Sequence, residues 1–359
     1  MESEKKLELG SSLEQIKSIV KQKQKLVLTN FENQDFEIED VQPLYLFPLT
    51  ILDYVEAVQK NSQKKIRLNI VKIDASLDYE EFFENQENSN LKNVEILVQE
   101  NYGQKEFETI KKIIEILKEK GILITLLIEN LCSVSAEFLK EVSSKIAFFK
   151  IQLKNILGTV EFEQFLKLLE IVLNEKSKDS LLLIKAYLDE EQSKFYENAV
   201  FNFQKLGVDI FQVSKELLPA NKENISVSDD VQQEVRKLEK LYDKNSQTTF
   251  LSVKDISILF YPRFEIDERN SKKCFACKLK PCMIDDLVLP CKVQEVVSNQ
   301  KKWFMHDFAG VQNETANELV GKTCTDCASL FENDTLSKIE EILLKNQIRN
   351  IKIITRREK

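Results

Sequence analysis

Six of the seven cysteines in the 359-residue chain lie in its last quarter, at spacings typical of metal ligands. They are Cys274, Cys277, Cys282, Cys291, Cys324 and Cys327. Thiolates are soft ligands that suit zinc and iron–sulfur clusters, and a Cys-x-x-Cys turn lets two of them converge on one centre. Because several thiolates close together need a cation to neutralise them, we expect these six to bind metal, either an iron–sulfur cluster or zinc.

The composition of the chain limits the partners and the cellular compartment that we expect for such a site. The net charge is −8 and the isoelectric point is near 5.2, so nucleic acid is not an expected partner. No apolar run reaches the roughly 18–20 residues that span a bilayer, and the N-terminus has no signal-peptide core. We therefore expect a cytoplasmic protein without membrane contact, whose clustered cysteines bind metal rather than form disulfides.

Apolar, strand-like runs alternate with amphipathic helices from about residue 65 onward. Continuous apolar strands separated by such helices predict an α/β fold with a parallel sheet covered by helices. No G-x-G-x-x-G occurs, which favours a partial or full β/α barrel over a Rossmann sheet. The expected strands are 66–73, 93–99, 122–129, 146–154, 180–188 and 208–214, with 255–262 as a candidate closing strand.

The same pattern predicts how the chain is divided. Residues 1–64 precede the barrel as an N-terminal cap or extension, and residues 65–262 form the barrel. Residues 263–359 form a cysteine-rich, metal-binding module that ends in a C-terminal helix. Within this module, "MIDDLVLP" between Cys282 and Cys291 predicts a short hairpin that presents both of its ends to one site.

The hairpin sequence carries a family resemblance. "CMIDDLVLPC" followed by a distant "CTDC" resembles the SPASM or twitch module of radical S-adenosylmethionine (SAM) enzymes, in which a hairpin of the type I-x-D-G-x-V-x-P-C supplies an auxiliary-cluster ligand. Leu287 takes the place of the glycine in our alignment. The predicted barrel is also similar to that family over roughly residues 60–260. The resemblance implies an auxiliary [4Fe–4S] cluster, with zinc as the alternative.

The resemblance fails at the residues that hold the catalytic cluster. In the family, the first strand runs into C-N-x-x-C-x-Y-C; here the segment is "IDASLDYE", with Ile73, Leu77 and Glu80 where the thiolates belong. The family's G-G-E-P after the second strand is "VQEN", which keeps only Glu100. Isoleucine and leucine cannot ligate iron, so we expect no radical-generating centre, no SAM binding and no catalytic residue.

The leading interpretation is therefore a radical SAM-like pseudoenzyme that acts in ribosomal peptide maturation. It would bind or present a precursor peptide, or support a peptide-modifying partner such as an ATP-grasp ligase. Two alternatives remain open: a redox protein that uses its C-terminal cluster for electron transfer, and a zinc-stabilised interaction module. Polar residues expected at or near the strand ends could contact a peptide at the barrel mouth. These are Glu100, Glu129, Lys150, Gln152, Lys154 and Lys185.

Overall fold

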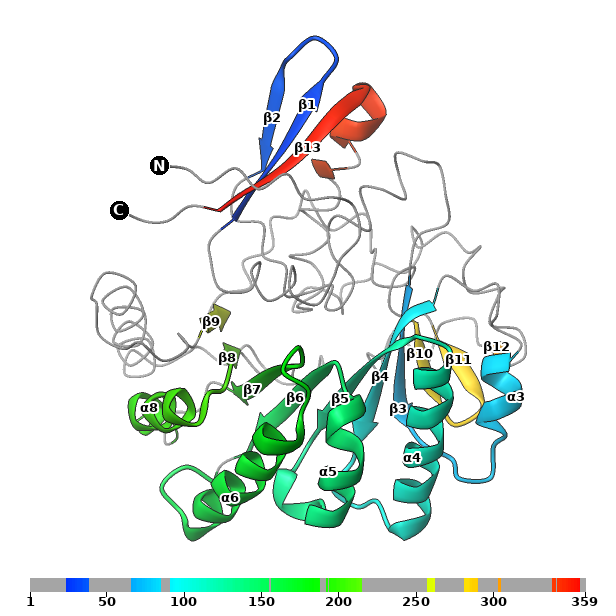
Figure 1. Cartoon of the computed structure of the whole chain (residues 1–359), viewed down its shortest axis with the longest axis vertical. Helices are drawn as coiled ribbons and strands as arrows, with labels where there is room; N and C mark the ends of the chain where they lie inside the picture. Colours follow the sequence, from blue (N-terminus) through cyan, green and yellow to red (C-terminus); the bar gives the residue numbers. More distant parts are fainter. Residues whose placement is uncertain are drawn as a thin grey trace, which may run out of the picture.

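The chain forms a large sheet covered by helices and a second, small sheet (Figure 1). The computed structural model describes residues 24–38, 66–84, 91–154, 156–187, 192, 194–214, 257–261, 281–289, 303–304, 338–339 and 341–355. Within these residues the large sheet has ten strands and the small sheet three. None of the helices in these segments combines the length and apolar composition that crossing a bilayer requires.

Seven parallel strands form most of the large sheet and follow one another in chain order. They are β3 (Ile66–Lys72), β4 (Leu91–Val98), β5 (Leu123–Ile128), β6 (Phe148–Leu153), β7 (Leu181–Tyr187), β8 (Ile210–Ser214) and β9 (Ser257–Tyr261). A Rossmann sheet reverses its strand order at the middle, whereas this order runs in one direction, as in a β/α barrel. The predicted α/β fold with a largely parallel sheet is confirmed, and its strand order is consistent with a partial barrel.

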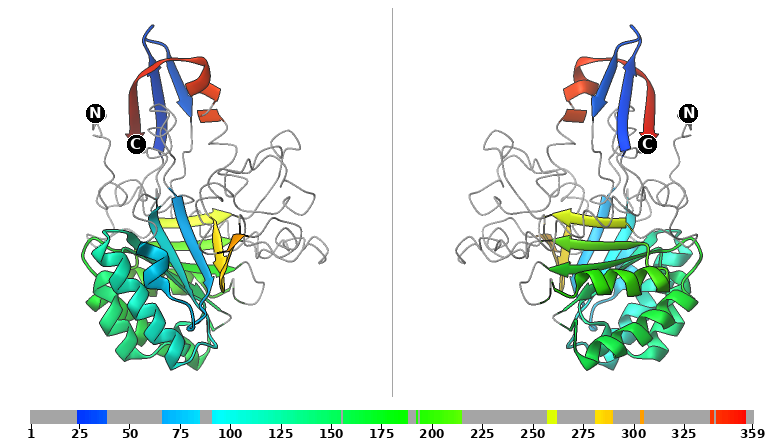
Figure 2. Two further views of the ribbon diagram at one scale, coloured as in Figure 1. Left: turned by 90° about the vertical axis from the view of Figure 1, so that its right-hand side faces the viewer. Right: turned by 90° about the vertical axis from the view of Figure 1, so that its left-hand side faces the viewer.

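The helices cover one face of this sheet (Figures 1 and 2). They are α3 (Tyr79–Glu84), α4 (Gln104–Glu119), α5 (Ala136–Val142), α6 (Val160–Glu175) and α8 (Tyr196–Leu206). In α4, Ile110, Ile113, Ile114 and Leu117 recur at helical spacing and are fully buried. This apolar stripe packs against the strands and makes the core of the barrel. Gly207 ends α8 at a φ of 87°, a left-handed conformation that glycine adopts without strain.

A short hairpin extends the large sheet beyond β3. It consists of β10 (Cys282–Ile284) and β11 (Leu287–Leu289), followed by β12 (Trp303–Phe304). β10 pairs in parallel with β3, so the hairpin belongs to the same sheet as the barrel strands. Met283 and Val288 lie in the same apolar core as the barrel residues.

The turn of this hairpin corrects one assignment made from the sequence. Leu287 is the first residue of β11 and pairs with Ile284, so Asp285 and Asp286 form the turn. Placing the turn glycine of the family pattern at Leu287 was therefore wrong. Asp285 has a φ of 54°, in the left-handed region that a short polar side chain tolerates better than a bulky one.

The small sheet joins the two ends of the described chain. β1 (Gln24–Asn30) pairs antiparallel with β2 (Asp35–Ile38) on one side and with β13 (Ile348–Thr355) on the other. Leu26 and Leu28 are fully buried in this sheet. An N-terminal segment and a C-terminal segment thus share one structural unit (Figure 1).

Candidate functional site

The face of the large sheet opposite the helices, here called the inner face, carries polar side chains. Strand residues alternate between the two faces, so the neighbours of core residues point to the inner face. In β4, Val94 and Ile96 belong to the core, whereas Asn93 and Glu95 lie on the inner face. Both polar side chains are buried, and so each needs hydrogen-bonding partners.

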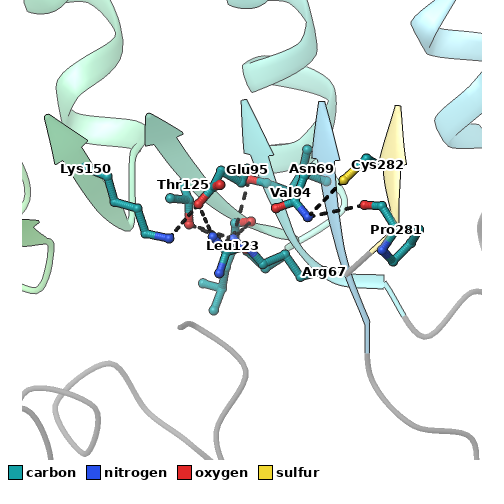
Figure 3. A network of polar contacts seen from close by, with 10 residues as sticks. Arg67, Asn69, Val94, Glu95, Leu123, Thr125, Lys150, Pro281 and Cys282 are labelled. Carbon is teal, nitrogen blue, oxygen red and sulfur yellow. Dashed lines mark hydrogen bonds and ion pairs between the residues drawn. The ribbon is translucent and has the colours of Figure 1, made fainter. Parts of the chain in front are cut away.

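Glu95 is the centre of a buried ion-pair network (Figure 3). Its Oε2 atom contacts the Arg67 guanidinium and lies 2.6 Å from Lys150 Nζ. The side chains of Arg67 and Glu95 are 4% and 8% exposed, and that of Lys150 is 18% exposed. Burial of this carboxylate is stabilised by two cations that come from different strands.

The network reaches across the strand that separates its members. Glu95 is on β4 and Lys150 on β6, about 10 Å apart across β5 at ordinary strand spacing. On β5, Thr125 pairs with Glu95 and Leu127 pairs with Lys150, so two inner-face positions lie between the charged groups. Thr125 is itself tied to β4, since Asn93 Nδ2 donates to Thr125 Oγ1 at 3.1 Å. The long Lys150 side chain reaches over β5 to the Glu95 carboxylate.

The inner face continues from β3 onto the hairpin. Asn69 pairs with Cys282, so both side chains lie on the same face. Asn69 Nδ2 donates to the carbonyl oxygen of Pro281 at 3.3 Å and lies 3.8 Å from Cys282 Sγ (Figure 3). Cys282 is 1% exposed. The hairpin is thus joined to the inner face by strand pairing and by a side-chain contact.

Charged and polar groups continue from the inner face to the carboxyl ends of the strands, the mouth of the barrel. Glu100, after β4, forms a solvent-exposed ion pair with Lys154, after β6. The hydrogen bond from Lys154 lowers the pKa of Glu100, so Glu100 is a carboxylate at neutral pH. Gln152 and Lys185 are paired neighbours on β6 and β7, and Glu129 is half-buried after β5. All six residues predicted for the mouth lie on the inner face or at these strand ends.

The loop after β3 is where a radical SAM enzyme would hold its catalytic cluster. Ile73 is 4% exposed and belongs to the core, and Leu77 packs against that core. Glu80 is exposed on α3. The loop therefore directs two hydrocarbon side chains toward the core beneath the helices and one carboxylate toward solvent.

Hydrogen bonds fix the backbone of this loop. We call closed the resulting conformation, in which Ile73 and Leu77 pack against the core. The Ile73 N–H donates to Tyr102 Oη at 2.8 Å, and the Asp74 N–H donates to Tyr79 Oη at 3.3 Å. The Asp74 carboxylate accepts from the backbone N–H of Ser76 at 2.9 Å and from its hydroxyl at 2.7 Å. These two bonds from Ser76 lower the pKa of Asp74.

The predicted metal ligands fall mostly outside the residues that the structure describes. Cys274, Cys277, Cys291, Cys324 and Cys327 lie outside them, and Cys282 lies inside β10. Among the described residues, no group of three or more histidine, cysteine, aspartate or glutamate residues could hold a metal ion. Ligation by the six cysteines stays a prediction.

Sequence reasoning did not single out the buried inner-face residues or the two loop tyrosines. Arg67, Asn69 and Glu95 stand at alternate positions in "IRLNIVK" and "NVEILVQ", which we interpreted as continuous apolar strands. Their period of two was the available signal that one face of these strands is polar. No local pattern marks Tyr102 as a partner of Ile73, because the two residues are on different strand ends.

Comparisons with known proteins identify the fold. No protein-family model matches the sequence, and no curated protein does either. A crystal structure of Streptococcus suis SuiB aligns with a TM-score of 0.52 and 15% identity, over 73% of this chain and 72% of that chain. SuiB bound to S-adenosylmethionine aligns with a TM-score of 0.51 and 13% identity, over 74% and 71% of the two chains. SuiB bound to precursor peptide SuiA gives 0.50 and 12%, over 77% and 73%. The likeness shows that this chain shares the fold of SuiB.

The buried network yields a prediction about stability. Replacing Glu95 by glutamine removes the negative charge between two buried cations, so we expect a loss of about 3–5 kcal/mol in the free energy of unfolding. Urea denaturation followed by circular dichroism measures this loss as a lower midpoint. The matched control is Glu100→Gln, whose exposed pair with Lys154 should leave the midpoint unchanged. Equal midpoints for the two variants would contradict the central role of Glu95.

Proposed function

We propose that this protein acts in ribosomal peptide maturation by binding a precursor peptide at the barrel mouth, without generating a radical itself. The observation that carries the proposal is the closed loop after β3, where Ile73 and Leu77 pack inward and Glu80 faces solvent. The radical SAM-like fold and the SuiB structure with its precursor peptide support the peptide part. A partner enzyme that performs the chemistry is part of the same proposal.

The catalytic cluster of a radical SAM enzyme does not fit the residues of this loop. Such a cluster needs three thiolates, and hydrocarbon side chains at positions 73 and 77 offer no ligand. One exposed carboxylate at position 80 leaves two ligand positions unfilled. The proposed function therefore does not include SAM cleavage.

The barrel mouth offers groups that suit a peptide backbone and its side chains. An extended peptide exposes N–H donors and carbonyl acceptors, which need partners when they leave water. Glu129 can accept from a peptide N–H, and Gln152 and Lys185 can donate to carbonyl or carboxylate oxygens. Beneath them, the Glu95 network fixes β3, β4 and β6 relative to one another. The peptide would thus meet a preorganised surface, which lowers the entropic cost of binding.

The cysteine-rich segment forms the second part of the proposal. We infer that its cysteines hold an auxiliary iron–sulfur cluster, with zinc as the alternative, because Cys-x-x-Cys pairs serve both. The hairpin supports a link between this segment and the barrel, since β10 pairs with β3 and Lys72 lies 3.0 Å from Asp285. A metal centre near the hairpin would therefore be anchored to the first barrel strand.

Peptide binding is tested with synthetic, fluorescein-labelled peptides, which are chosen as the products of any short reading frames that genome sequencing finds beside the gene. We expect saturable binding by fluorescence anisotropy, and about tenfold or greater weakening for Lys185→Ala, because a hydrogen bond from a charged group is lost. The control is Lys145→Ala, which removes the same charge from a lysine paired with Glu115 on the helix-covered face. Equal affinities of the two variants, or no saturable binding, would contradict the proposed site.

The absence of radical chemistry is tested by product analysis. Anaerobically reconstituted protein, incubated with SAM and dithionite, should give no 5′-deoxyadenosine above a control without protein, because the β3 loop offers no thiolate to a cluster. Liquid chromatography with mass spectrometry measures the product. Clear formation of 5′-deoxyadenosine would contradict the pseudoenzyme assignment, and its loss in Cys291→Ser would place the chemistry in the cysteine-rich segment.

Metal content tests the cysteine-rich segment directly. Cys291→Ser and the double variant Cys324→Ser/Cys327→Ser should lose the bound metal, since each removes thiolate ligands. Cys132→Ser is the matched control and should keep the metal, because Cys132 lies in the helix layer next to α6. Elemental analysis and visible absorption distinguish the metals: a broad band near ~400 nm indicates iron–sulfur, and colourless protein with zinc indicates an interaction module. Metal retention in all variants would contradict this ligand set.

A further inference from the structure

Two tyrosine hydroxyls meet the backbone at the point where β3 ends. Tyr102 lies before α4 and accepts from Ile73 N–H; Tyr79 begins α3 and accepts from Asp74 N–H. Tyr79 is 4% exposed, and Tyr102 packs against the main core. The two rings come from different elements, so together they hold consecutive residues of the loop from two directions. We call this pair the tyrosine clamp.

The rest of the loop is bonded to itself. Asp74 accepts from the Ser76 amide through its carboxylate and from the Leu77 amide, at 3.2 Å, through its carbonyl oxygen. Asp78 then accepts from the Glu81 amide at 3.1 Å and caps α3. With the clamp, the amides of residues 73, 74, 76 and 77 are all directed at oxygen atoms of the protein. A loop that ligates a cluster directs its amides toward the cluster sulfurs instead.

The protonation state of the tyrosines supports the clamp. Burial raises the pKa of Tyr79 and that of Tyr102 to about 12 each. Asp285, in the hairpin turn, lies near both rings and contributes in the same direction. Both hydroxyls therefore remain neutral over the physiological range, and each can accept an amide hydrogen bond while donating its own proton.

We infer that the tyrosine clamp holds the β3–α3 loop in a closed conformation that cannot take a catalytic iron–sulfur cluster, even when thiolates are present. The inference rests on the proposed absence of radical chemistry and locates its cause in the loop backbone as well as in the missing cysteines. A cluster would require Ile73 to leave the core and two tyrosine hydrogen bonds to break. The loop thus keeps one conformation at the barrel mouth.

Hydrogen exchange tests the clamp in the full-length protein. Tyr79→Phe/Tyr102→Phe removes only the two hydroxyl acceptors and leaves both rings in place. We expect the peptide that covers residues 73–78 to exchange about tenfold faster by mass spectrometry, while β4 and β5 stay unchanged. The control is Tyr196→Phe on α8, which should leave exchange in residues 73–78 as in the wild type. Unprotected amides in the wild type, or no acceleration in the double variant, would overturn the clamp.

Restoring the thiolates tests the consequence for metal binding. The variant Ile73→Cys/Leu77→Cys/Glu80→Cys should bind no more iron than the wild type after anaerobic reconstitution, with folding checked by circular dichroism. A gain of about four irons per chain, the content of one [4Fe–4S] cluster, would overturn the inference. Neither measurement uses a precursor peptide. A failure of precursor binding and a failure of the clamp are therefore distinguishable.

Discussion

The burial of one carboxylate between two cations constrains the inner face of this protein. Removing Glu95 from water is costly, and Arg67 and Lys150 offset that cost only while β3, β4 and β6 keep their register and curvature. Lys150 crosses β5 to make its contact and passes the inner-face positions of Thr125 and Leu127. The network therefore favours one arrangement of the strands. This arrangement in turn fixes the positions of the polar side chains at the carboxyl ends of the strands.

Beside this network, the first loop of the mouth is formed by packing and by backbone hydrogen bonds. The chain shares its fold with SuiB. In the loop after β3, Ile73 belongs to the core, and two tyrosine hydroxyls accept hydrogen bonds from the amides that follow the strand. Because function depends on the site rather than on the scaffold, the shared fold does not by itself give this chain an activity.

Strand pairing links parts of the chain that are far apart in sequence. The hairpin at residues 282–289 adds to β3, about 210 residues earlier, and contributes Met283 and Val288 to the barrel core. β1 and β13 join the two ends of the described chain into one small sheet. The hairpin at the start of the cysteine-rich segment is thus continuous with the barrel sheet, through the Lys72–Asp285 pair and the Asn69–Pro281 hydrogen bond.

The sequence by itself determined the barrel strands and helices, because apolar periodicity reports local burial: 66–73 became β3 (Ile66–Lys72), and the stripe from Ile110 to Leu117 became the buried face of α4. It also determined that positions 73 and 77 offer no ligand, since residue type alone decides this. Only the tertiary structure decided that Glu95 meets Arg67 and Lys150, that Tyr102 holds Ile73, and that β13 pairs with β1. These contacts join residues on different elements, whose distance depends on register and curvature of the whole sheet and leaves no local pattern in the chain.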